Sequence, residues 1–329
     1  MNRRADHRRR LFSRAERGGS EAAPAIRGAI AVDRVCVERH AGRRAVAPSR
    51  WIDPEDGQFD LSKRTRRRPL APERTIVALL CAGIHAACFA QTAADDANKS
   101  NNPLNLAASF NLQNFYTPSL FGVSSHTNDF LLRPTIPVGP NGLIPVPQIF
   151  RLTVPVSTRP DPAGGYNTGL GDINLFDIFL LHGGATEIGV GPLVTLPTAT
   201  DRTLGTGKWQ AGLAAVVVNA SRQRLLGALV QWQHSFAGQS SRPDVQSLTT
   251  QPFVIWNLPE GWYLRSTGTW TFDLQHGDYY IPLGLGAGKA WKSGSTIYNA
   301  FVEPQYSVAH SGNVPKWQIF AGLNMTFGK

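Results

Sequence analysis

The end of the chain alternates between apolar and polar positions. In residues 317–327, which read WQIFAGLNMTF, every second residue from Trp317 to Phe327 is apolar, whereas the other register is mainly small or polar. A period of two is that of a β-strand with one apolar and one polar face. Residues 129–137, 150–157 and 262–273 repeat the pattern. The chain therefore contains several strands that lie between an apolar and a polar environment.

Twelve such segments follow one another from about residue 107, and none shows convincing helical spacing. Each is close to the roughly nine to eleven residues that cross a bilayer obliquely, and an even number is expected of bacterial outer-membrane barrels. We therefore predict an all-β fold, a twelve-stranded antiparallel up-and-down transmembrane β-barrel over residues 107–329. The segments centre on Asn111, Leu132, Val154, Leu175, Gly191, Ala214, Gln231, Pro252, Gly268, Leu285, Phe301 and Gly322.

Alternation alone fits a soluble sheet as well as a membrane barrel, so lipid contact needs separate support. Aromatic residues cluster near the segment ends, where interfacial girdles lie, as at Trp209, Trp256 and Trp262. Connections alternate between short and long, except for the long turn at 138–148. These features predict a bacterial outer-membrane location with lipid as a partner.

The final strand also matches an assembly signal. It ends on an aromatic residue with apolar residues at alternate positions before it, which is the pattern that the barrel assembly machinery reads. We expect this machinery to be a partner of the chain. The residues that carry the signal are Trp317, Leu323, Met325 and Phe327.

Charge separates the front of the chain from the rest. Residues 1–74 hold 19 Lys and Arg against 10 Asp and Glu, whereas residues 75–329 hold 14 against 13. A basic stretch, the apolar run of residues 75–90 and a small residue at 90 together predict a signal peptide over 61–90. Residues 1–60 have no apolar periodicity and are interpreted as a mis-called or disordered Arg-rich leader. A nucleic-acid-binding arm is the less favoured alternative, and residues 91–106 are interpreted as a periplasmic N-terminal segment.

Four segments carry a family resemblance. They are GLGDINLFDIFLL (169–181), GVGPLVTLPTATDRTLGTGKWQAGLAAVVV (189–218), LLGALVQWQHSFAG (225–238) and QPFVIWNL (251–258). The chain from about residue 102 to 327 resembles the bacterial outer-membrane family of the MetA pathway of phenol degradation, whose members are often labelled transporter and sometimes neuromedin U. The resemblance implies a twelve-stranded outer-membrane barrel that passes aromatic or other hydrophobic small molecules.

The sequence offers no combination of residues typical of a catalytic or cofactor site. A barrel phospholipase needs a His and a Ser two residues apart on one strand face, whereas His234 and Ser235 are adjacent and point to opposite faces. The glycines of residues 284–291 lack the spacing of a phosphate-binding loop and are interpreted as a small-residue lumen face or as relief of barrel curvature. The histidines are scattered without metal-ligand spacing. We predict neither enzyme activity nor a cofactor or metal.

Charged residues remain as candidates for a lumen site. Arg133 and Arg151 lie almost symmetrically about the turn at 141–143, so a hairpin sets them close together on the inner face. Two neighbouring guanidinium groups repel unless a carboxylate or an anion lies between them. A salt-bridge network that fills the barrel and a charged constriction that selects solutes both remain open. The candidate partners are Asp129, Asp172, Glu187, Asp273 and Glu303, with Arg265 as a third cation.

These observations predict a channel for passive uptake or efflux of small, hydrophobic or aromatic compounds. A non-conducting structural or adhesive barrel is the first alternative, and a soluble lipocalin-like binder is the second. Strand number does not decide between an open and a filled lumen, because twelve strands lie between the filled eight-stranded and the open sixteen-stranded barrels.

Overall fold

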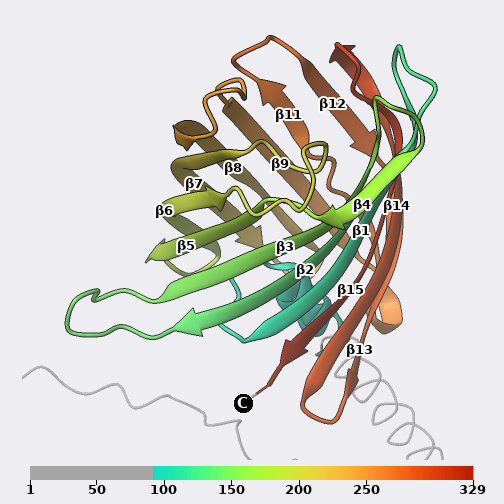
Figure 1. Cartoon of the computed structure of the whole chain (residues 1–329). Coiled ribbons are helices and arrows are strands. Elements are labelled where there is room, and N and C mark those ends of the chain that lie inside the picture. The colour runs from blue at the N-terminus through green and yellow to red at the C-terminus, as the bar shows by residue number, and fades with distance from the viewer. Residues whose placement is uncertain (1–91, 329) are drawn as a thin grey trace, which may run out of the picture. The chain divides into compact units, whose positions relative to one another are not determined.

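A closed antiparallel sheet dominates the computed structural model, which describes residues 92–328. The predicted leader and signal peptide (1–60 and 61–90) lie outside the described residues. Apart from three pairs of short strands described below, each strand pairs with the next along the chain, and the last strand pairs with the first to close the barrel (Figure 1). The strands are β1 (Ser109–Leu120), β2 (Thr127–Val138), β3 (Gln148–Pro160), β4 (Tyr166–Leu170), β5 (Ile173–His182), β6 (Thr186–Leu196), β7 (Lys208–Ala220), β8 (Arg224–Gly238), β9 (Gln246–Asn257), β10 (Trp262–Ser266), β11 (Trp270–Asp273), β12 (Tyr279–Gly284), β13 (Gly286–Ser293), β14 (Thr296–Ser311) and β15 (Pro315–Phe327).

Three of the barrel's spans are each broken into two shorter strands. β4 and β5 both pair with β3, β10 and β11 both pair with β9, and β12 and β13 both pair with β14. Each pair therefore counts as one span with a short interruption, which reduces the fifteen strands to twelve spans within residues 92–328. The predicted twelve-stranded up-and-down barrel is confirmed.

The outer surface of the barrel is apolar on every side. Each span exposes large apolar side chains, such as Ile136 on β2, Leu213 on β7 and Val302 on β14. The neighbouring positions point inward, and many are polar and buried, as Glu303 is beside Val302. A closed barrel of this kind satisfies its backbone hydrogen bonds internally and presents apolar side chains to lipid. The chain is thus a bacterial outer-membrane protein, as predicted.

Strand β15 follows the predicted faces. Trp317, Ile319 and Phe327 are exposed on the outside, whereas Asn324 and Thr326 are buried on the inside. The Phe327 amide donates to the Ala108 carbonyl oxygen at 2.8 Å, which ties the end of β15 to the start of β1. Phe327, which ends the predicted assembly signal, therefore also contributes to the contact that closes the barrel.

Deletion of residues 327–329 is expected to lower the yield of folded barrel severalfold, because it removes both the terminal aromatic residue and this closing contact. Deletion of residues 328 and 329 alone serves as the matched control and is expected to leave most of the yield. Heat-modifiable migration on SDS gels measures the folded fraction. Equal loss in both variants would contradict the role assigned to Phe327.

The connections give the barrel its orientation. One end of the barrel carries the start of β1 and the end of β15, and its connections are short at 183–185, 221–223 and 294–295. The connections at the opposite end include the longer ones at 197–207 and 239–245. Outer-membrane barrels have short periplasmic turns and longer extracellular loops, so the first end is periplasmic. The connection at 139–147 is the long periplasmic exception that the sequence indicates.

A short helix precedes the barrel. Residues 92–101 are helical, and among residues 92–328 no helix is both long and apolar enough to cross a membrane. Ala97 and Leu104 are fully buried, packed against inward residues of the barrel such as Ile178 and Leu225. The segment that the sequence indicates as periplasmic thus begins with a helix and packs against the inside of the barrel at its periplasmic end.

Candidate functional site in the barrel lumen

Two arginines project from adjacent strands into the lumen. Arg133 lies on β2 and Arg151 on β3, and Thr135, two residues after Arg133 on the same face, pairs directly with Arg151. The two arginines are therefore diagonal neighbours, a relation in which Cα atoms lie roughly 7–8 Å apart. The hairpin brings them together as the sequence predicts.

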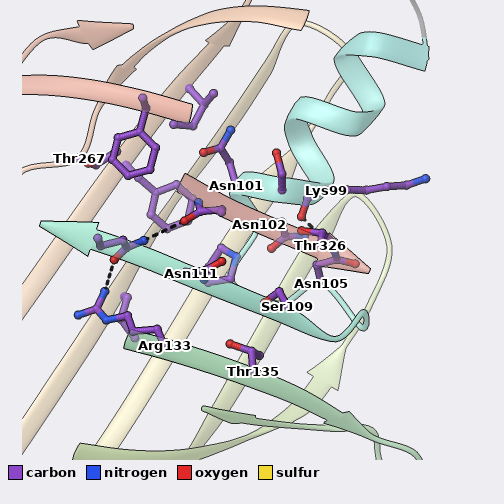
Figure 2. Close-up of a pocket in the computed structure, with 18 of the residues that line it drawn as sticks. Lys99, Asn101, Asn102, Asn105, Ser109, Asn111, Arg133, Thr135, Thr267 and Thr326 are labelled. Atoms are coloured by element: carbon purple, nitrogen blue, oxygen red, sulfur yellow. Dashed lines mark hydrogen bonds between the residues drawn. The ribbon is translucent and has the colours of Figure 1, made fainter. Parts of the chain in front are cut away.

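No carboxylate neutralises this pair within the described residues. Arg133 donates from Nη1 to Gln113 Oε1 at 2.7 Å, which is a neutral acceptor (Figure 2). Arg151 forms no hydrogen bond or salt bridge with a described residue, and its guanidinium carbon lies 4.7 Å from the ring centroid of Phe176. The Nε atoms of both arginines and the hydroxyl of Thr135 are buried without a partner among residues 92–328. We call Arg133, Arg151 and Thr135 the basic constriction.

The carboxylates expected to meet these arginines lie elsewhere. Asp129, near the extracellular end of β2, accepts two hydrogen bonds from Arg159 Nη2 at 2.8 and 2.9 Å. Asp273 binds His276 in the turn after β11, and Glu187 accepts from Asn102 Nδ2 at 2.6 Å at the periplasmic end. None of these three candidates lies between the two arginines, because each is separated from the constriction along the barrel axis.

Asp172, the fourth expected partner, organises the extracellular loop 197–207. Its Oδ2 atom accepts from the Thr206 amide at 2.7 Å and from the Thr206 hydroxyl at 2.8 Å. Within this loop, hydrogen bonds from the Thr203 amide and hydroxyl lower the pKa of Asp201. The Arg242 side chain donates to the Thr206 carbonyl oxygen at 2.9 Å, which joins this loop to the loop at 239–245. The two loops therefore fold together at the outer end of the barrel.

Glu303, the fifth expected partner, forms a buried network with Arg265. Arg265 Nε donates to Glu303 Oε2 at 2.8 Å, and both side chains are almost completely buried. The Thr267 amide and hydroxyl each donate to the same carboxylate at 2.7 Å. This group matches the salt-bridge interpretation, so the third predicted cation is neutralised whereas the other two are not.

Glycines on the strand between them make this network possible. A Cβ atom on Gly284 would lie 2.4 Å from Glu303 Oε1, and one on Gly286 would lie 2.6 Å from Glu303 Cβ. A Cβ atom on Gly288 would meet the ring of Tyr263. The alternating glycines of residues 284–288 thus form the small-residue lumen face that the sequence indicates, and Arg265 and Glu303 reach each other across it.

Cavities lie on both sides of the basic constriction. The outer one encloses about 990 Å³, including solvent, and is lined mainly by neutral polar residues of β3 to β9, with Phe115 and Phe176. The inner one has a volume of about 870 Å³, again including open solvent, and is bounded by residues 99–103, Asn105, Asn111 and Arg265. Both cavities are lined by Arg133, Arg151, Leu229 and Gln251. The constriction therefore lies where the two halves of the lumen meet.

The helix of residues 92–101 and the segment after it bound the inner cavity at its periplasmic end (Figure 2). Asn98 donates to the Ser221 carbonyl oxygen and accepts from Asn257, both at 2.8 Å. Burial raises the pKa of Asp96 on this helix, and the charges of Lys292 and Lys99 partly oppose that effect. The helix is thus held by polar contacts to the turn at 221–223 and to the periplasmic end of β9. The alternation of apolar and polar residues in the strands cannot reveal such contacts. A polar stretch that contains buried Ala97 offers little sequence signal.

The adjacent His234 and Ser235 point to opposite faces, as predicted. His234 is exposed on the outside, whereas Ser235 is buried and accepts from the Val245 amide at 3.0 Å. Among residues 92–328 no group of three or more His, Cys, Asp or Glu side chains is placed to hold a metal ion.

Comparison with known proteins supports the fold. No protein-family model matches the chain, and no curated protein matches it. An outer membrane channel from Pseudomonas putida F1 is similar in structure at 16% identity and a TM-score of 0.51, over 68% of this chain and 96% of that one. The NanC porin (9%, TM-score 0.43, 67% and 100%) and the outer membrane phospholipase A from Escherichia coli (12%, TM-score 0.35, 72% and 98%) are more distant. At these identities the likeness extends to the barrel fold alone.

Proposed function

We propose that this protein is an outer-membrane channel for passive movement of small solutes, among them hydrophobic or aromatic compounds. The observation that carries the proposal is the pair of lumen cavities on either side of the basic constriction. Polar side chains line much of both, including Gln231, Thr249 and Asn111. A polar lumen of this kind is typical of barrels that pass water-soluble solutes.

A non-conducting structural barrel is the alternative that one observation favours. At the periplasmic end, Ala97 and Leu104 complete an apolar cluster with inward residues such as Val218 and Ile255. This cluster fills part of the lumen in the way that a small barrel is filled by side chains. The helix therefore acts as a removable plug in the channel interpretation and as part of a permanent core in the structural one.

Liposome swelling separates the two interpretations. Liposomes that contain the folded barrel are expected to swell faster than empty ones in a phenol-like solute or a sugar-like solute of similar mass, with the aromatic solute favoured. Heat-denatured protein at the same protein-to-lipid ratio is the control. Absence of flux for both solutes, with the barrel folded, would favour the structural barrel.

The basic constriction is expected to make the channel prefer anions. Arg133→Ala and Arg151→Ala should each reduce the ratio of chloride to potassium permeability severalfold, because a lumen lined by one sign of charge raises the local concentration of its counter-ion by about tenfold or more. The reversal potential of single channels in a salt gradient measures this ratio. An unchanged ion preference in both variants would contradict a role in selectivity.

A further inference from the structure

The surroundings of the basic constriction combine positive charge with aromatic surface. Around the barrel wall, β15, β1, β2, β3 and β5 are consecutive neighbours. Phe320 on β15 pairs with Phe115 on β1, and their rings stack with centroids 4.1 Å apart. Arg151 on β3 pairs with Phe176 on β5. Around the wall, the strands of the two arginines thus lie between the strands that carry Phe115 and Phe176. Phe176 lies beside Arg151, Phe115 lies further toward the extracellular end, and both rings line the outer cavity.

Three polar atoms of the constriction lack hydrogen-bond partners among residues 92–328. The Nε atoms of Arg133 and Arg151 and the Thr135 hydroxyl are buried without a hydrogen-bond partner among the described residues. Buried polar groups are usually satisfied, and two adjacent cations repel each other. A single anion placed between them would reduce the repulsion and accept these hydrogen bonds. Guanidinium groups pair especially well with planar carboxylates.

The outer cavity provides space and suitable walls for the rest of such a solute. Without open solvent its volume is about 310 Å³, which lies near the lower end of the range typical of small-molecule sites. Among the described residues that line it, Asp172 is the one carboxylate, and it already accepts from the Thr206 amide and hydroxyl. Neutral donors and acceptors such as Thr153 and Gln233 line the remainder. The arrangement disfavours cations and leaves aromatic faces beside the anion position.

We propose that Arg133, Arg151 and Thr135, flanked by Phe115 and Phe176, form a binding site for the carboxylate of a small aromatic acid that passes through the lumen. This inference rests on the proposed channel function for its role, but binding can be measured separately. The carboxylate lies between the two guanidinium groups, and the ring packs against Phe176 or Phe115. Neutral aromatic compounds of the same size lack the charge that the two arginines recognise.

Block of chloride current by benzoate tests the site in reconstituted full-length channels. Benzamide is the neutral isostere of benzoate, and acetate has the carboxylate but no ring. Inorganic phosphate is an anion with neither a carboxylate nor a ring. Benzoate is expected to block at about millimolar concentration, with benzamide inactive and acetate and phosphate at least several times weaker. Arg133→Gln/Arg151→Gln should weaken the benzoate block by about tenfold or more. Phe176→Leu should weaken benzoate but leave acetate unchanged.

Arg159→Gln is the matched control. Arg159 lies on β3, as Arg151 does, but it pairs with Asp129 near the extracellular end of the barrel. This variant should retain the benzoate block within about twofold, since salt screens charges at that separation. Equal block by benzoate and benzamide, or block unaffected by the double substitution, would overturn the site. Equal block by phosphate and benzoate would overturn its aromatic part.

Calorimetry of benzoate binding to the folded barrel in detergent distinguishes failure of the site from failure of the channel. If benzoate binds only when both arginines are present, but the barrel carries no current, the binding site is supported and the channel function is contradicted. Current without arginine-dependent binding would retain the channel and reject the site. Heat-modifiable migration checks that each variant is folded, and Phe176→Leu keeps the test available if the double substitution impairs folding.

Discussion

Glu303→Ala is expected to destabilise the folded barrel by about 3–5 kcal/mol, the usual cost of removing one partner from a buried ion pair. The substitution leaves the Arg265 guanidinium buried without its carboxylate. It also removes the acceptor of the Thr267 amide, which the interruption between β10 and β11 leaves outside the strand ladder. Urea unfolding in lipid vesicles, followed by tryptophan fluorescence, measures the difference.

Asp129→Ala provides the comparison for this prediction. Asp129 also pairs with an arginine at 2.8 Å, but both side chains are about one-third exposed. Exposed pairs contribute only about 0–1 kcal/mol, so the two variants remove similar bonds at very different expected costs. Arg265→Met/Glu303→Leu should recover part of the loss, because it removes both charges together. Equal destabilisation by Glu303→Ala and Asp129→Ala would show that burial does not control the cost.

The spans could be predicted because most of the wall separates lipid from a polar interior. The pattern weakens where the interior is apolar. On β7 the run LAAVVV has no alternation, because Val217 faces lipid while Val216 and Val218 pack in the cluster that includes Ala97 of the helix. The helix was missed for the related reason that its buried face consists of small and polar residues. Its burial depends on inward residues distant in sequence.

Which charged side chains pair with each other in the lumen was harder to predict than which residues point into it. Hairpin symmetry places Arg133 beside Arg151, since it depends only on a local turn. Asp129 lies four residues from Arg133 along β2, roughly 13 Å at the rise of a strand, so direct pairing could have been excluded. Glu303 and Arg265 contact each other across the span that lies between their strands. Their relative positions along the barrel axis depend on the stagger of the strands, which the alternation of apolar and polar residues does not encode. The alternating glycines at 284–288 were the available signal of a close approach.

Removal of residues 92–104 is expected to raise single-channel conductance by about twofold or more, because the conductance of a pore increases with its open cross-section. These residues bound the inner cavity and are held by hydrogen bonds to Ser221 in the turn at 221–223 and to Asn257 at the end of β9. The variant should fold less stably, since Leu104 and Ala97 no longer cover the apolar cluster. A chain that starts at residue 92, with the helix intact, is the matched control in planar bilayers.

A second variant releases the helix without removing it. Asn98→Ala/Asn102→Ala eliminates the hydrogen bonds to Ser221, Asn257 and Glu187 but retains Leu104 and its apolar contacts. Larger or more frequent conductance steps are expected than in the control, because a weakened plug leaves the periplasmic end more often. Conductance equal to that of the control in both variants, with the barrels folded, would place the helix outside the ion path. Absence of current in the control and in both variants, with the barrels folded, would instead favour the structural barrel, because removal of the helix would then open no path through the lumen.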